Sequence, residues 1–151
     1  MTGAAAARTA REVSASAGAA EPLGVTLLEV GVNVAVMSTT AERIDFCLFD
    51  ERGEREVARL PLTRVSDTTF AAFVEGVGAG ARYGLRADGP YQPQAGDWFD
   101  PAKLLIDPYA RALDRPFVYD QRLAAPRSAA LDTAALVPKA IVTAGATELA
   151  G

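Results

Sequence analysis

The 151-residue sequence contains no histidine and a single cysteine, Cys47. The lack of histidine excludes Ser-His-Asp and Cys-His catalysis, imidazole general bases and histidine-ligated zinc. One cysteine can form neither an internal disulfide nor a zinc site built from thiolates, and it favours a reducing, cytoplasmic location. Any catalysis would therefore rest on carboxylates, lysine or tyrosine, and the sequence predicts no metal site and no cofactor.

Long apolar runs and clusters of basic residues are also missing. No stretch approaches the roughly 20 apolar residues that span a membrane, and the 15 Lys and Arg residues are spread along the chain. The formal net charge of −4 at pH 7 argues against a nucleic-acid surface. With half of its residues apolar and 23% charged, the chain has the composition of an ordinary globular protein of one domain. We therefore expect neither a nucleic acid nor a membrane as partner.

Large side chains are almost absent from the first 21 residues, where alanine, serine, threonine, glycine and arginine predominate. Such a segment cannot bury enough surface to offset the entropy of ordering, so we expect residues 1–21 to be a disordered tail. It has no unbroken apolar run after a basic start, which argues against a secretory signal, whereas a transit peptide stays open as an alternative. Residues 145–151 are expected to form a second tail.

From residue 22 the pattern changes to short alternating runs. The segment "GVNVAVMS" (31–38) is β-branched and apolar, and "RIDFCLFD" (43–50) sets Ile44, Phe46 and Leu48 against charged neighbours. Turns separate these runs at intervals of about 8–12 residues, which is typical of a sandwich. No apolar stripe of helical period interrupts them before residue 100. The sequence therefore predicts an all-β protein, with an antiparallel β-sandwich over residues 22–113.

Four segments occur in an order and spacing that resemble a known family: "GVNVAVMSTTAERIDFCLFDERGEREVARLPL", "GVGAGARYGLRADGPYQP", "FDPAKLLIDPYARAL" and "VPKAIV". Together they resemble the N-terminal domain of bacterial glycogen debranching enzymes of the isoamylase type. That domain is a family 48 carbohydrate-binding module, and the enzymes belong to glycoside hydrolase family 13. The resemblance implies an immunoglobulin-like fold, followed at residues 114–144 by an irregular, Pro-rich extension toward a catalytic domain. The chain departs from the family's usual "HGP" and "GHRFNP", because it has "DGP" at 88–90 and "GDWFDP" at 96–101.

The catalytic barrel of these enzymes is absent from the sequence. A (β/α)8 barrel needs about 250 residues, and here "VPKAIV" is followed only by "TAGATELAG". Asp97 and Asp100 stand close together beside an aromatic pair, which suggests a carboxylate dyad of the kind that cleaves glycosidic bonds. Capping of turns is the more ordinary role of such aspartates. We therefore predict that this chain is not an enzyme and has no catalytic residue.

The aromatic segment "YQPQAGDWF" suits sugar binding. An aromatic ring can lie against the C–H face of a pyranose while polar side chains bond its hydroxyls. We therefore expect Trp98 and Tyr91 to be the stacking rings, and Lys103 and Asp97 to be the polar partners. The predicted ligand is an α-glucan such as glycogen or a maltooligosaccharide. Two roles stay open for Trp98, which are sugar contact and a partly exposed lid over the core.

The apolar residues that follow suggest a second use of the same region. The resemblance implies that Leu104, Leu105, Ile106 and Tyr109 cover the join between the sandwich and the barrel, and that they are exposed where the barrel is missing. Three hypotheses therefore stand side by side. The chain is a glucan-binding module, a docking domain on a glycoside hydrolase catalytic domain with little sugar affinity, or a truncated product of a debranching-enzyme gene.

Overall fold

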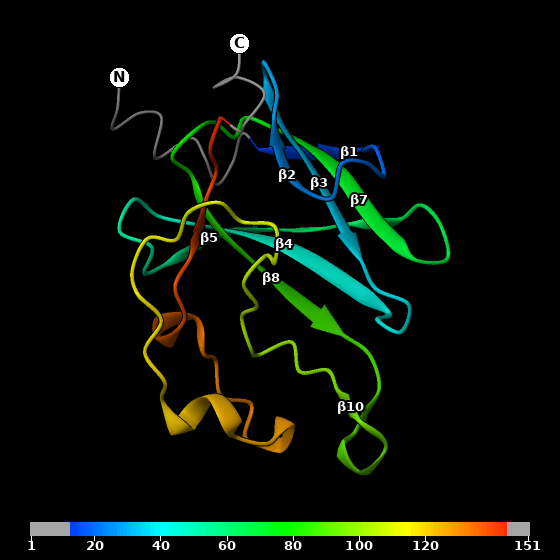
Figure 1. Cartoon of the computed structure of the whole chain (residues 1–151), viewed down its shortest axis with the longest axis vertical. Helices are drawn as coiled ribbons and strands as arrows, with labels where there is room; N and C mark the ends of the chain where they lie inside the picture. The colour runs from blue at the N-terminus through cyan, green and yellow to red at the C-terminus, as the bar shows by residue number, and fades with distance from the viewer. Residues whose placement is uncertain (1–12, 145–151) are drawn as a thin grey trace.

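A computed structural model describes residues 13–144 as two packed antiparallel β-sheets (Figure 1). The first sheet has the strand order β1-β7-β3-β2, with β6 beside β7. Its strands are β1 (Ser14–Ser16), β2 (Gly24–Leu27), β3 (Gly31–Met37), β6 (Thr63–Arg64) and β7 (Thr69–Glu75). The second sheet has the order β11-β8-β4-β5. Its strands are β4 (Arg43–Phe49), β5 (Glu56–Pro61), β8 (Arg82–Asp88) and β11 (Ala140–Ile141).

Between residues 13 and 144 no α-helix is present, and the only helical turns are short 3-10 segments. None of these helices is long and apolar enough to cross a membrane. The all-β antiparallel sandwich predicted from the sequence is therefore confirmed.

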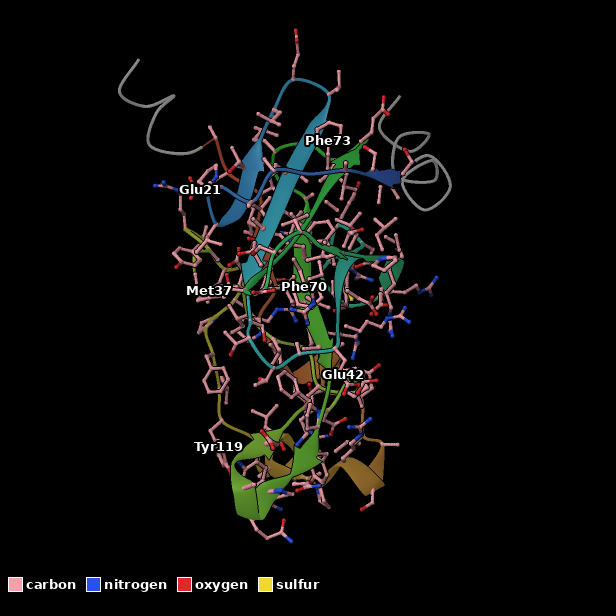
Figure 2. All side chains as sticks on the ribbon, turned by 90° about the vertical axis from the view of Figure 1, so that its right-hand side faces the viewer. Glu21, Met37, Glu42, Phe70, Phe73 and Tyr119 are labelled. Carbon is pink, nitrogen blue, oxygen red and sulfur yellow. The ribbon has the colours of Figure 1, made fainter. Side chains whose placement is uncertain are left out.

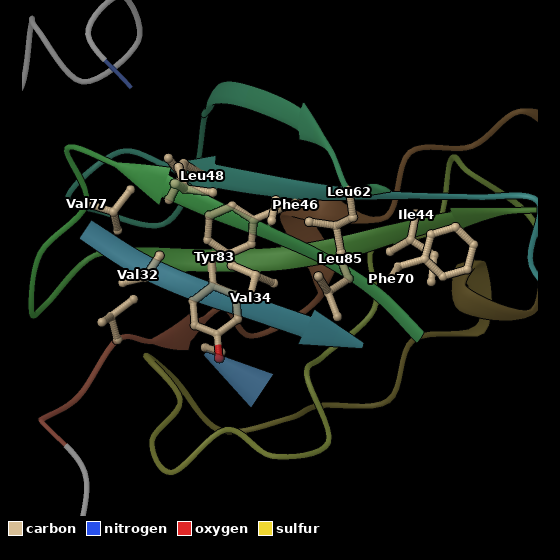
Figure 3. Close-up of a cluster of buried hydrophobic side chains, with 14 of the residues drawn as sticks. Val32, Val34, Ile44, Phe46, Leu48, Leu62, Phe70, Val77, Tyr83 and Leu85 are labelled. Atoms are coloured by element: carbon tan, nitrogen blue, oxygen red, sulfur yellow. The ribbon is translucent and has the colours of Figure 1, made fainter. Parts of the chain in front are cut away.

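The alternation in the sequence places the main core between the two sheets. In β4, Ile44, Phe46 and Leu48 belong to this core, together with Val34 of β3 (Figure 3). The ring of Phe46 lies 5.4 Å from the ring of Tyr83 in β8, centroid to centroid. Successive side chains of a strand point to opposite faces. The residues of β4 that alternate with Ile44, Phe46 and Leu48 therefore lie on the outer face of the second sheet.

A smaller apolar cluster covers part of that outer face. Cys47 and Phe49 of β4 pack there against Leu104 and Val137, which come from the chain beyond β8. Lys139 is buried beside them, and its Nζ donates to the Val137 carbonyl oxygen at 2.7 Å and lies 5.2 Å from the centroid of the Phe49 ring. Burial lowers the pKa of this lysine. Residues 101–139, which we call the cover segment, thus cover this part of the sheet.

Residues 114–144 take part in the sandwich, whereas the sequence predicts an extension outside it. Strand β11 pairs with β8, and the Val142 amide donates to the Ala81 carbonyl oxygen at 2.8 Å. Ala140 and Val142 belong to the main core. Without β11, strand β8 would be an open sheet edge with unpaired backbone groups. The irregular part lies before β11 and contains η2 (Gln121–Ala124), η3 (Arg127–Ala129) and η4 (Ala134–Leu136).

The N-terminal segment also differs from its prediction, between residues 13 and 21. Strand β1 pairs with β7, and the Ala19 backbone exchanges hydrogen bonds of 2.7 and 2.9 Å with the Asn33 side chain. Small residues permit this close approach, because a Cβ on Gly18 would lie 2.4 Å from the carbonyl carbon of Ala72. Backbone hydrogen bonds therefore hold a segment that buries few large side chains. Residues 1–12 and the predicted tail at 145–151 lie outside the described residues.

Candidate functional site

The chain after β8 folds into a small hairpin that carries the predicted aromatic rings. It consists of β9 (Tyr91–Gln92), η1 (Pro93–Ala95) and β10 (Asp97–Trp98). Gly96 ends η1 with a φ of 87°, and its N–H donates to the Pro93 carbonyl oxygen at 3.1 Å. Glycine adopts this left-handed conformation without strain. The strand pairing places Trp98 opposite Tyr91, at the lower end of the molecule in Figure 1.

Trp98 is exposed to solvent and has a second ring beside it. It is 65% exposed, and the Tyr91 ring lies edge-on to it, with centroids 6.5 Å apart and planes at 86°. An exposed indole next to a phenol offers a flat apolar surface together with a hydrogen-bonding group. The two predicted rings thus lie side by side. Trp98 is more exposed than a side chain that covers the core as a lid would be.

Arg127 of η3 holds the base of this hairpin. Its guanidinium group donates to the carbonyl oxygens of Gly89 (3.1 Å) and Phe99 (3.2 Å), which flank the hairpin, and to Oδ1 of Asp88 (2.9 Å). The same group lies 6.0 Å from the centroid of the Tyr91 ring. The backbone N–H of Arg127 donates to the Tyr91 hydroxyl at 3.1 Å. The orientation of the rings therefore depends on a residue that sequence reasoning missed, because no local pattern links it to the hairpin.

The two predicted polar partners have different surroundings. Asp97 is half-buried on β10, next to Trp98. Lys103 comes after the hairpin, and its ammonium group donates to the Ala125 carbonyl oxygen. Asp97 therefore lies beside the aromatic pair, whereas the ammonium group of Lys103 is bonded within the cover segment.

The surroundings of Asp100 favour turn capping over a part in a carboxylate dyad. Asp100 is buried, and its Oδ1 accepts the Ala102 N–H at 3.0 Å. Its Oδ2 has no hydrogen-bond partner within residues 13–144. This bond to the following turn is the ordinary local role of aspartate.

Leu104 does not belong to an exposed docking surface, contrary to the prediction. It is 4% exposed, and a Cβ on Gly84 would lie 2.7 Å from its side chain. Leu105 bridges to β8 through its backbone, so the side chains of Leu104 and Leu105 point to opposite sides. Leu105 is 47% exposed. Ile106 is half-buried, whereas Tyr109 is exposed. The predicted set is thus divided between the outer cluster and the surface.

Exposed apolar residues continue beyond the predicted set. Leu113, Phe117, Val118 and Tyr119 are between 41% and 70% exposed, and Tyr119 is labelled at the lower left of Figure 2. We call these four residues, together with Leu105 and Tyr109, the exposed strip. In the sequence, the apolar run "PFVY" at 116–119 could have indicated these residues. It has no alternation that would assign it to a strand or a helix. Phe117, Val118 and Tyr119 are consecutive in the chain, and large exposed apolar side chains that lie together are typical of an interaction site.

The described part of the chain lacks the features of a catalytic or metal centre. Residues 13–144 contain no group of His, Cys, Asp or Glu side chains that could hold a metal ion, and they form no (β/α)8 barrel. Cys47 is buried, and burial raises the pKa of its thiol to about 12. A thiol of this kind is not a nucleophile at neutral pH.

Comparison with known proteins agrees with this description. Residues 22–110 match the family described as "Carbohydrate-binding module 48 (Isoamylase N-terminal domain)". The chain is 41% identical over 129 residues to a glycogen debranching enzyme of Yersinia enterocolitica, and the match covers 84% of this chain and 19% of that protein. It is 40% identical over 106 residues to a Mycobacterium tuberculosis protein described as "Glycogen operon protein GlgX homolog", covering 70% of this chain and 14% of that protein. The chain thus spans less than a fifth of the length of these relatives.

Solved structures resemble the chain in fold. The catalytic module of the glycogen-degrading pneumococcal virulence factor SpuA aligns with a TM-score of 0.57 at 20% identity, covering 81% of this chain and 16% of that one. The pullulanase SAP of Group B Streptococcus aligns with a TM-score of 0.57 at 19% identity, covering 83% of this chain and 15% of that one. At these identities the likeness concerns the sandwich alone.

Proposed function

Because the chain belongs to the family of carbohydrate-binding module 48 (isoamylase N-terminal domain), we propose that it binds an α-glucan such as glycogen. In this proposal it is the N-terminal module of a cytoplasmic glycogen debranching enzyme and has no catalytic activity of its own. The observation that carries the proposal is the 65% exposure of Trp98 beside Tyr91. An indole in this position is available to stack on a pyranose ring.

The test is a titration of tryptophan fluorescence with maltoheptaose. The chain has one tryptophan, so the signal reports on Trp98 alone. A shallow, stacked site predicts a Kd of roughly 0.1–1 mM. Trp98→Ala should weaken binding, measured by calorimetry, about three- to tenfold, because it removes the stacking ring. Its melting temperature should change by less than about 3 °C, because most of the ring is already in water.

Tyr119→Ala is the matched control, since Tyr119 is an equally exposed aromatic residue on the exposed strip. This variant should bind maltoheptaose like the original protein. Fluorescence that does not respond to the sugar, together with equal affinities of the Trp98→Ala variant and the original protein, would refute the assignment of Trp98 to the glucan site.

A second function is favoured by the exposed strip. Large apolar side chains such as Phe117, Val118 and Tyr119 are costly to leave in water. Burial against the catalytic domain of a glycoside hydrolase would remove them from solvent. Docking of this kind uses residues other than the aromatic pair, so one chain can combine both functions.

A further inference from the structure

On the outer face of the second sheet, the side chains are charged at one end of the strands and mostly apolar at the other end. In β4 the outward residues are Asp45, then Cys47 and Phe49, and the last two lie in the outer apolar cluster. In β8 they are Gly84, under the Leu104 side chain, then Arg86 and Asp88. The cover segment therefore lies over the apolar half of the face, and the charged half forms an open pocket of about 270 Å³. This volume lies just below the range of about 300–1,000 Å³ for small-ligand sites, and it suits a site for a single sugar unit.

The strand register explains which side chains line this pocket. Arg43 lies opposite Asp88, and Asp45 lies opposite Arg86, across β4 and β8. On the other side of β4, Cys47 lies opposite Arg59 of β5. Ala87 of β8 and Pro101, where the cover segment begins, also line the pocket. Three neighbouring strands thus contribute charges of both signs to one concave surface.

The arginines of the pocket differ in how fully they are bonded. Arg86 is buried and uses all three of its nitrogens, on the carbonyl oxygens of Pro101 and Ala102 and on two carboxylates. Arg43 donates from Nε to Asp45, and Arg59 donates from Nε to Glu56. Within residues 13–144 their terminal Nη groups make no hydrogen bond, and both side chains are exposed. Two guanidinium groups of the pocket are therefore available as donors.

The balance of charges indicates the kind of ligand. The carboxylates of Asp45 and Asp88 lie among the arginines, which weakens attraction for an anion. A neutral ligand rich in hydroxyl groups can accept hydrogen bonds from the guanidinium groups and donate to the carboxylates. A glucosyl unit has this chemistry.

A chain of contacts joins the pocket to the aromatic pair. The Asp88 carboxylate accepts a hydrogen bond from Arg127, the Arg127 guanidinium lies near the Tyr91 ring, and that ring meets Trp98. Asp88 and Tyr91 contact the same guanidinium group, so they face the same side of the molecule. Three residues of extended chain span about 10 Å, which is within reach of a short oligosaccharide.

We infer that the pocket lined by Arg43, Asp45, Arg59 and Asp88 is a second subsite for a glucosyl unit of the oligosaccharide whose neighbouring units stack on Trp98. The inference rests on the proposed function. It adds that affinity depends on the length of the glucan, because only a longer ligand reaches from the rings to the pocket.

The test compares maltose and maltoheptaose by calorimetry on the full chain and on the variants Arg43→Ala and Arg59→Ala. The original protein should bind maltoheptaose more tightly than maltose. Each variant should bind maltoheptaose about three- to tenfold more weakly, as expected for the loss of one or two hydrogen bonds. Binding of maltose, and the response of Trp98 fluorescence to it, should stay within a factor of about two of the original values. Arg55→Ala is the matched control, because it removes an exposed arginine from outside the pocket, and it should change neither affinity.

The possible results separate the two claims. If the original protein binds neither sugar, both the proposed function and the second subsite are refuted. If it binds both sugars and the two variants behave like it, only the subsite is refuted. A loss that is equal for maltose and maltoheptaose, or that also occurs in Arg55→Ala, would mean a general effect of charge and would also overturn the subsite. Melting curves of all variants accompany the titrations, and Arg59→Lys, which keeps the charge and loses the planar fork, should give an intermediate loss if Arg59→Ala is unstable.

Discussion

Replacing Arg86 with methionine should loosen the cover segment and destabilise the whole sandwich. Arg86 is 2% exposed and donates to the Pro101 and Ala102 carbonyl oxygens at 3.0 Å each. It also donates to Glu56 at 3.1 Å and to Asp132 at 3.0 Å. Burial opposes its charge, but the two carboxylates outweigh that effect and raise the pKa of the guanidinium. The residue therefore joins the sheet to two separate stretches of the cover as a permanent cation.

The magnitude follows from what each partner loses. Breaking a fully buried charge pair costs about 3–5 kcal/mol, but the side chain of Asp132 is 61% exposed and that of Glu56 is partly exposed. Both carboxylates can therefore regain water, which lowers their share. The two carbonyl oxygens lose their donor at a cost of about 1–3 kcal/mol each when they stay dry. Methionine fills most of the volume, so we expect a total loss of about 2–4 kcal/mol in the free energy of unfolding.

Thermal unfolding followed by far-UV circular dichroism measures this loss. For a chain of this size, at about 2–4 °C per kcal/mol, it corresponds to a fall in melting temperature of about 4–16 °C. Arg55→Met is the control, since Arg55 lies exposed in the turn before β5, and it should leave the melting temperature almost unchanged. A second measurement uses Asp132→Ala, which should cost about 1 kcal/mol or less alone and should add little to Arg86→Met, because the two residues share one interaction. A fall of less than about 2 °C in Arg86→Met would refute the view that this arginine fastens the cover.

Two further predictions concern the exposed strip and the response to acid. In sedimentation experiments, the chain should associate with the catalytic portion of the Yersinia enzyme, produced without its own N-terminal module. Phe117→Ser and Tyr119→Ser should each weaken this association at least about tenfold, as expected for interface anchors. Equal association of the variants and the original protein would argue against docking through the exposed strip. Burial opposes the charge of Asp114, but hydrogen bonds from the Arg115 side chain and the Lys139 backbone outweigh it and lower the pKa of the carboxyl. The original protein should therefore be more stable than Asp114→Asn above pH about 4, and this advantage should disappear as the pH falls through the lowered pKa. Urea unfolding at pH 7 and at pH about 2–3 would show a smaller difference in the free energy of unfolding between the two proteins at the lower pH. An equal difference in the free energy of unfolding at both pH values would contradict this role of the Asp114 charge.

The sequence alone predicted the strands of the sandwich and selected Trp98 and Tyr91 as candidate rings, but it did not predict the hairpin that pairs them. In β4, Ile44, Phe46 and Leu48 alternate with residues of the other face, and this period of two is a property of neighbouring residues. Trp98 and Tyr91 meet because a tight turn at Gly96 pairs the short strands that carry them. The alternation along each strand and the closeness of the two rings in the chain are local, so a pattern of neighbouring residues reveals them, whereas the pairing of the strands into sheets is not local.

The tertiary structure decided how the second half of the chain is used. Leu104 and Leu105 are equivalent in composition, but the space above Gly84 buries the first and leaves the second in water. Arg127 reaches the hairpin from η3, and β11 closes the sheet beside β8. The charged pocket exists because three strands set their outward side chains side by side and the cover segment, which begins at Pro101, leaves this part of the sheet open. These contacts join residues far apart in the sequence, so they depend on where the chain returns to the sheet, and no local period encodes that path.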